Sequence, residues 1–167
     1  MFATDPAYQQ HCRWMERALA LAAAAGQAGE VPVAAIVVDE HEALIAESAN
    51  FRERHHDPTA HAEVLALRQA GKVRGNWNLT GCKLYVTLEP CSMCAGAIVL
   101  GRISLLVYGA SDWKSGSVRS VLNIPDSAAS NHRLTVLSGI LEPQCRTQLQ
   151  AWFKQRRRSQ QSSNSQS

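Results

Sequence analysis

The sequence predicts one α/β domain in which helices flank a central five-stranded mixed sheet in three layers. Short β-branched runs alternate with longer segments of helical character along most of the chain. A strand, a short helix and a strand between residues 83 and 108 are typical of a βαβ unit, whose two strands are parallel. The 167 residues, of which 46% are hydrophobic, suffice for one core.

The first part of the chain is expected to form a helix and a hairpin. The alanine-rich segment from Asp5 to Ala28, with Pro6 in its first turn, predicts a helix. The apolar run 33–38 is too short and too β-branched for a buried helix, so it predicts a central strand. A polar turn leads to a second strand at 43–50, which should be antiparallel to the first.

A polar loop at 51–58 separates this hairpin from a second helix, which we expect to start at Thr59 or Ala60 and to be closed by Gly71. The remaining elements are predicted as strand, helix, strand, connection, strand and helix at 83–88, 91–100, 103–108, 109–132, 133–137 and 141–158. The long connection is expected to contain functional loops and a short helix. The domain therefore spans residues 1–158, and the polar tail 159–167 is expected to be disordered because it has nothing to bury.

Two clusters of potential metal ligands lie about thirty residues apart. The first contains His61 and Glu63, and the second contains Cys91 and Cys94 directly after Pro90. One imidazole and two thiolates form a ligand set that zinc prefers, and three protein ligands leave a fourth position for water. Proline fits a helix start, where the helix dipole favours thiolates. The pattern predicts one Zn²⁺ per subunit, bound by His61, Cys91 and Cys94.

Glu63 is the predicted catalytic residue. A carboxylate two positions from a zinc-binding histidine is not needed as a ligand, yet it can carry protons for a metal-bound water. Residues i and i+2 of a helix point about 200° apart, so His61 must lie at the first turn, where its side chain can bend back. Taken alone, the Cys-x-x-Cys motif also fits a thioredoxin-like redox pair, and the His-x-Glu triplet also fits an ordinary surface helix.

Together the two clusters form the H-x-E and P-C-x-x-C pattern of zinc nucleobase deaminases. The runs 56–63 and 87–97 resemble the bacterial tRNA adenosine deaminases, which convert the wobble adenosine of an arginine tRNA anticodon to inosine. The likeness extends from about Trp14 to about Arg158. It implies a cytidine deaminase-like fold, a tRNA anticodon stem-loop as partner, and a homodimer. The small residues of the 91–100 helix could form the dimer interface, or that helix could instead be buried inside the domain.

The resemblance also implies roles for five further residues. Asn50 would contact the base, Val33 and Leu88 would form apolar pocket walls, and Asp112 would touch the anticodon backbone. Phe153, next to a basic cluster, would belong to a closing helix on the anticodon loop. The chain departs from the family pattern at a few positions, which concern loop shape rather than the ligands: Ala34, Ser48, Ala49, Trp113 and Arg119.

Charge and cysteine content limit the environment of the protein. The net charge of +3 is modest, but basic residues cluster from Lys154 to Arg158, which fits either phosphate contact or a solvated helix end. An aromatic residue beside them suits an unstacked base. No apolar stretch approaches a membrane span, the amino terminus lacks a signal-peptide layout, and five cysteines suggest free thiols. We expect a cytoplasmic protein without a membrane partner.

Three functions remain open from the sequence. The first is deamination of adenosine to inosine at the wobble position of a tRNA, with tRNA-Arg as the expected substrate. The second is a free-base or nucleoside deaminase of guanine or cytidine type, which would need no basic closing helix. The third is a non-enzymatic zinc-binding RNA module, which has no use for Glu63.

Overall fold

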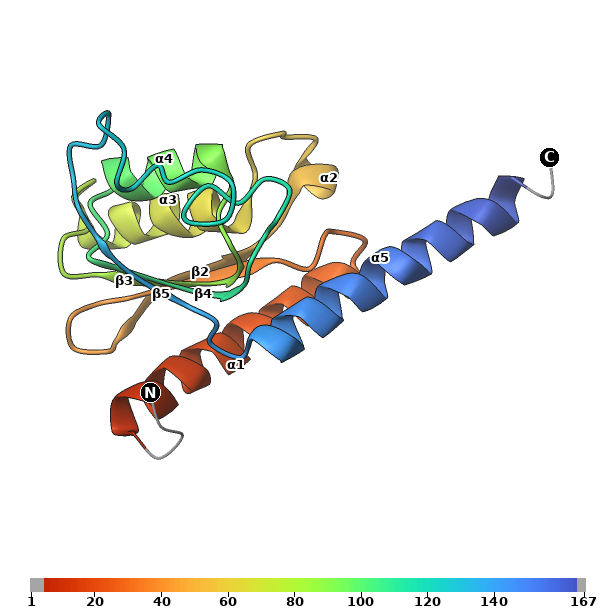
Figure 1. Cartoon of the computed structure of the whole chain (residues 1–167), viewed down its shortest axis with the longest axis horizontal. Helices are drawn as coiled ribbons and strands as arrows, with labels where there is room; N and C mark the ends of the chain where they lie inside the picture. Colours follow the sequence, from red (N-terminus) through yellow and green to blue (C-terminus); the bar gives the residue numbers. More distant parts are fainter. Residues whose placement is uncertain (1–4, 165–167) are drawn as a thin grey trace.

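The computed structural model describes residues 5–164, in three layers around one sheet (Figure 1). The strands are β1 (Ala34–Val38), β2 (Leu44–Ala49), β3 (Lys83–Leu88), β4 (Leu105–Ala110) and β5 (Thr135–Ser138). The helices are α1 (Pro6–Gln27), α2 (Arg52–His55), α3 (Ala62–Arg74), α4 (Ser92–Leu100) and α5 (Glu142–Asn164). None of the helices in this range is both long and apolar enough to span a membrane.

The sheet has the strand order β2-β1-β3-β4-β5 and mixes both strand orientations. β1 is antiparallel to β2 and to β3, whereas β3, β4 and β5 run parallel. The predicted five-stranded mixed sheet and its βαβ unit are therefore confirmed. Because of these directions, the start of β1, the end of β2 and the ends of β3 and β4 lie at the same edge of the sheet.

Helices cover both faces of the sheet (Figure 1). α3 and α4 pack on one face around Leu84, Val86 and Ile98, and α1 and α5 cover the other around Met15, Ile36 and Tyr85. All five residues of β1 are buried, as expected for a central strand covered on both sides. The two cores hold the shared edge of the sheet in place.

The second predicted helix has different ends in the structure. α3 continues through Gly71 and ends at Arg74, where Gly75 takes the left-handed conformation with φ 61°. A glycine inside a helix costs only about 1 kcal/mol relative to alanine, whereas the left-handed cap strongly favours glycine. The preceding polar loop also contains the one-turn helix α2, which the sequence did not predict.

Two predictions about the second half of the chain were wrong. The connection 111–134 contains turns and bends but no helix. α5 extends six residues beyond the predicted end of the domain, so residues 159–164 are helical rather than disordered. In this segment the Ser159 and Ser162 hydroxyls donate to carbonyls four residues earlier, and an established helix adds further turns at little cost. Residues 165–167 of the predicted tail lie outside the described residues.

Candidate active site

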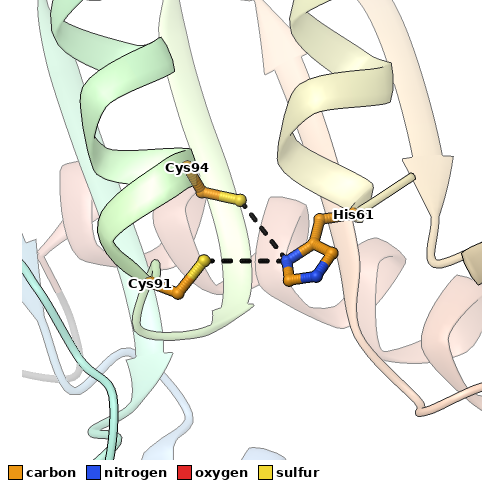
Figure 2. A group of neighbouring side chains, drawn as sticks. All are labelled: His61, Cys91 and Cys94. Atoms are coloured by element: carbon orange, nitrogen blue, oxygen red, sulfur yellow. Dashed lines mark hydrogen bonds between the residues drawn. The ribbon is translucent and has the colours of Figure 1, made fainter. Parts of the chain in front are cut away.

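The predicted metal ligands come from the first residues of two helices. His61 is the N-cap of α3 and Cys91 is the N-cap of α4, both with extended backbones, and Cys94 lies in the first turn of α4. α4 starts just after the end of β3, at the edge of the sheet described above. Figure 2 shows the three side chains pointing toward one another from the two helix starts.

The distances among the donor atoms fit a tetrahedral zinc site. The Nδ1 atom of His61 lies 3.7 Å from the Cys91 Sγ atom and 3.6 Å from the Cys94 Sγ atom (Figure 2). Typical zinc–sulfur and zinc–nitrogen bond lengths at a tetrahedral angle place nitrogen and sulfur about 3.6 Å apart. Within residues 5–164, these three side chains form a group that is positioned to bind a metal ion.

The electrostatics of the group favour one thiolate. Hydrogen bonds with Cys94 and then with His61 lower the pKa of the Cys91 thiol to about 4, despite its partial burial. The same contact with Cys91, together with burial, raises the pKa of Cys94. The Cys91 thiolate in turn raises the pKa of His61. A cation bound among these groups would replace their shared protons.

Glu63 lies beside the ligand group without belonging to it. It is the second residue of α3, is only 4% exposed, and lines the same cavity as His61 and Cys91. His61 stands outside the regular helix, so the opposed directions expected of residues i and i+2 do not apply. Burial is the largest influence on Glu63 and raises the pKa of its carboxyl. A buried carboxyl with a raised pKa is suited to holding and releasing a proton.

The cavity has a volume of about 140 Å³, below the roughly 300–1,000 Å³ that drug-sized ligands occupy. Four residues predicted to contact substrate line it, namely Val33, Asn50, Leu88 and Asp112. Cys94 is fully buried behind its wall. A larger hollow of about 740 Å³ lies between α1 and α5, but it contains none of the potential metal ligands.

Asn50 links the end of β2 to the start of α3. Its Oδ1 atom accepts a hydrogen bond from the Ala62 backbone N–H at 3.0 Å, and its Nδ2 atom donates to the Val31 carbonyl oxygen at 3.2 Å. An amide has two donor hydrogens and two acceptor lone pairs, so one of each remains for a ligand. Asn50 therefore holds the helix that carries Glu63 and can still contact a base.

Phe153 is the predicted site residue that the structure does not bring into the cavity. It lies on α5, is 40% exposed, and packs edge-on against Trp152. The guanidinium of Arg156 lies 5.4 Å from the Trp152 ring. This aromatic and basic surface of α5 is separate from the ligand group.

Residues missed from the sequence also line the cavity: Glu30, Val31, Arg52, Glu89 and Ser115. Glu30 and Glu89 are 1% and 2% exposed, which is unusual for carboxylates without a cation partner. In the sequence, each of these two residues stands out only as an acidic residue next to an apolar strand. Glu30 precedes Val31 and β1, and Glu89 directly follows β3.

Comparison with known proteins agrees with this geometry. The family model of the MafB19-like deaminases matches residues 9–157. The tRNA-specific adenosine deaminase of Haemophilus influenzae is 46% identical over 145 residues, covering 87% of this chain and 84% of that protein. The chain belongs to the tRNA-specific adenosine deaminase family.

Solved structures with the same fold include members with different substrates. A chain from a study of A-to-I editing by tRNA:A34 deaminases at the wobble position is 41% identical with a TM-score of 0.79, covering 81% of this chain and 98% of the other. The guanine deaminase of Nitrosomonas europaea is 25% identical with a TM-score of 0.71, over 91% and 94% of the two chains. The cytidine deaminase-like fold is thus shared by family members and by a guanine deaminase.

Proposed function

We propose that this protein hydrolyses adenosine to inosine at the wobble position of a tRNA anticodon, with an arginine tRNA as its substrate. The observation that carries the proposal is the group of His61, Cys91 and Cys94, with the buried carboxyl of Glu63 in the same cavity. The identity to tRNA-specific adenosine deaminases supports the choice of substrate. The protein would act in the cytoplasm, where tRNA is available.

The resident metal is Zn²⁺, one per subunit, held by His61, Cys91 and Cys94. Two sulfur donors and one imidazole nitrogen are a zinc-type set, and the distances between them match tetrahedral coordination. When bound, zinc would supply a hydroxide near neutral pH, because it lowers the pKa of a coordinated water to about 7.

Glu63 is the catalytic residue of the proposed reaction. Its carboxylate accepts a proton from the attacking water and passes it to the ring nitrogen as the new C–O bond forms at C6 of adenine. Glu63 then takes the proton of the new C6 hydroxyl and delivers it to the amino nitrogen as the C–N bond breaks, so that ammonia leaves and the C6 carbonyl of inosine remains. Burial excludes competing water from the carboxyl and favours its protonated form between the steps.

The pocket residues orient the base. Val33 and Leu88 offer apolar walls, and the free hydrogen-bonding capacity of Asn50 faces the same cavity. Asp112 and Ser115, which follow β4 in the chain, also line this cavity. A volume of about 140 Å³ suits one extruded base rather than a larger ligand.

The rest of the RNA would contact exposed cations and aromatics. Phe153 and the basic residues Lys154 to Arg158 lie on exposed turns of α5, which projects beyond the body of the domain (Figure 1). Basic residues beside an exposed ring suit phosphates and unstacked bases.

The active form is a homodimer in this proposal. A groove of about 640 Å³ between α3 and α4 is mostly apolar and includes Ala97, Leu100 and Trp77, of which the last two are 67% exposed. A second copy would cover this surface. Sedimentation at micromolar concentration should give twice the chain mass, and Leu100→Glu should shift it toward the monomer. A wild-type monomer would contradict the dimer.

One assay separates the candidate functions. Purified protein is incubated with an anticodon stem-loop, free adenosine, guanine and cytidine in parallel, and products are identified by mass. Inosine in the RNA alone supports the proposal. The fold shared with guanine deaminases favours a small-molecule deaminase as second candidate, which a product from guanine or cytidine would support. RNA binding without product would indicate a non-enzymatic module.

A further inference from the structure

Glu89 is a buried carboxylate whose partners all lie in one loop. Its Oε1 atom accepts from the backbone N–H groups of Val118, Arg119 and Ser120 at 3.2, 2.7 and 2.9 Å. Its Oε2 atom accepts from the Asp112 backbone N–H at 3.1 Å and from the Ser120 hydroxyl. One side chain therefore satisfies four backbone donors of the segment 111–120, which we call the 111–120 loop.

The 111–120 loop is built around this carboxylate. A Cβ atom at Gly116 would lie 2.5 Å from the Glu89 carboxylate and closer still to the Asp112 carbonyl oxygen. The loop also donates the Ser117 N–H to the Pro90 carbonyl oxygen at 2.9 Å, next to Cys91. It presents Asp112 and Ser115 to the cavity. The position of Glu89 thus sets one wall of the pocket.

Glu30 has the same relation to a second wall of the cavity. Its Oε1 atom accepts from the Arg54 backbone N–H at 2.8 Å, and its Oε2 atom accepts from the Glu53 backbone N–H at 3.2 Å. Both donors belong to α2, whose first residue, Arg52, lines the cavity. Neither Glu30 nor Glu89 forms an ion pair within residues 5–164.

We propose that Glu30 and Glu89 are positioning residues that fix α2 and the 111–120 loop as the two polar walls around the target base. The inference rests on the proposed function, because the walls matter for an RNA substrate. Both oxygens of each carboxylate accept hydrogen bonds from backbone N–H groups. The donors belong to a loop in one case and to a one-turn helix in the other. Binding energy from the substrate is therefore not spent on ordering these segments.

Glu89→Gln and Glu30→Gln test the role, with Glu42→Gln as the matched control. Glu42 is also a hydrogen-bonded carboxylate, but it lies at the other end of β3 and accepts from Trp14 Nε1 at 2.8 Å. For the stem-loop substrate we expect KM to rise about tenfold in both test variants, with kcat within about threefold of wild type. Zinc content should stay at one per chain, and Glu42→Gln should leave KM unchanged.

A purely structural role predicts a different result. Partial misfolding lowers the active fraction, so apparent kcat and zinc content fall together while KM stays at its wild-type value. That outcome, or a KM change no larger than that of Glu42→Gln, overturns the proposal.

Hydrogen exchange gives a readout that does not depend on activity. Glu89→Gln should speed amide exchange in the 111–120 loop, Glu30→Gln should do so in α2, and Glu42→Gln should do neither. Absence of inosine with the wild-type protein would overturn the proposed function, whereas unchanged exchange in both segments would overturn the positioning role.

Discussion

The two ends of β3 carry polar groups that are organised in different ways. At its start, Lys83 pairs with Glu42, and the same carboxylate accepts a hydrogen bond from Trp14 Nε1. At its end, His61, Cys91 and Cys94 direct their donor atoms toward one another, all within 4.8 Å (Figure 2). The first group contains a positive and a negative charge, which neutralise each other without a bound ion. The second group contains only electron-pair donors that face one another, so a bound cation would stabilise it.

Burial differs in the same direction. The Lys83 and Glu42 side chains are 25% and 30% exposed, so water shares in solvating them. Glu63, Glu30 and Glu89 at the other end are all at most 4% exposed. Burying a carboxylate is costly unless it is paired or hydrogen-bonded. At this end of β3, carboxyl groups are held in fixed positions away from water, which is typical of an active site.

Removing one of the proposed metal ligands should have the largest effect at the end of β3 that carries the candidate site. In Cys94→Ala the site keeps only two ligands, so stoichiometric zinc and inosine formation should both be lost. Metal analysis of the purified protein and the stem-loop assay measure the two losses. A variant without zinc that still forms inosine at the wild-type rate would break the distinction between the two ends.

Glu63→Gln should have the next largest effect. Loss of a general acid–base typically lowers kcat by about 10²- to 10⁴-fold, and zinc should remain because the carboxyl is not a ligand. Burial already disfavours the charged form of Glu63, so the neutral amide should not lower the melting temperature. Glu42→Gln is the control, with normal kcat. Loss of zinc in Glu63→Gln would count against its assignment.

At the structural end, Glu42→Gln should change stability and not catalysis. The substitution weakens the contacts with Lys83 and Trp14, which are partly exposed, so we expect about 1 kcal/mol of destabilisation. Urea unfolding measures the change, and the stem-loop assay should give wild-type kcat. A tenfold lower kcat with intact folding would show that the two ends are coupled.

The smallest expected effect is the pH dependence of the stability difference between wild type and Glu42→Gln. Burial alone would raise the pKa of Glu42, but hydrogen bonds from Lys83 and Trp14 outweigh it and hold the pKa below its usual value. A carboxylate with a lowered folded-state pKa contributes stability that is complete above its unfolded pKa and is lost as pH falls through the folded value. The stability gap between wild type and Glu42→Gln should therefore begin to shrink as pH falls below about 5 and continue to shrink as pH falls through the lowered folded-state pKa. A stability difference that stays constant with pH would mean that packing, and not the charge of Glu42, causes it.

Much of the fold and the ligand group could be predicted from the sequence. β1 is a continuous apolar run, and β3 is rich in β-branched, aromatic and aliphatic residues, so local composition is enough to identify both. His61, Cys91 and Cys94 could be chosen because their chemistry and spacing are specific to a metal, whatever the details of packing. The same local reasoning misplaced the end of α3, because Gly71 and Gly75 are both plausible stops and only the latter takes the left-handed conformation.

The pocket walls could not be predicted in the same way. Four of the donors to Glu89 are backbone N–H groups up to 31 residues away, and such donors are present at every non-proline residue. Their convergence depends on tertiary structure rather than on residue type. Likewise, Phe153 was chosen for its chemistry and its resemblance to a family position, whereas its distance from the cavity depends on how α5 packs.

The placement of the ligands at two helix starts also affects how the chain holds together. All five cysteines lie within residues 5–164 and are free, so no disulfide links the part of the chain that the structure describes. A metal ion between residues 61 and 91 would close a loop of about thirty residues, and a disulfide across such a span restricts the unfolded chain by about 3–4 kcal/mol. The ion would then link the starts of α3 and α4 reversibly. Chelation should therefore lower the free energy of unfolding as well as abolish activity.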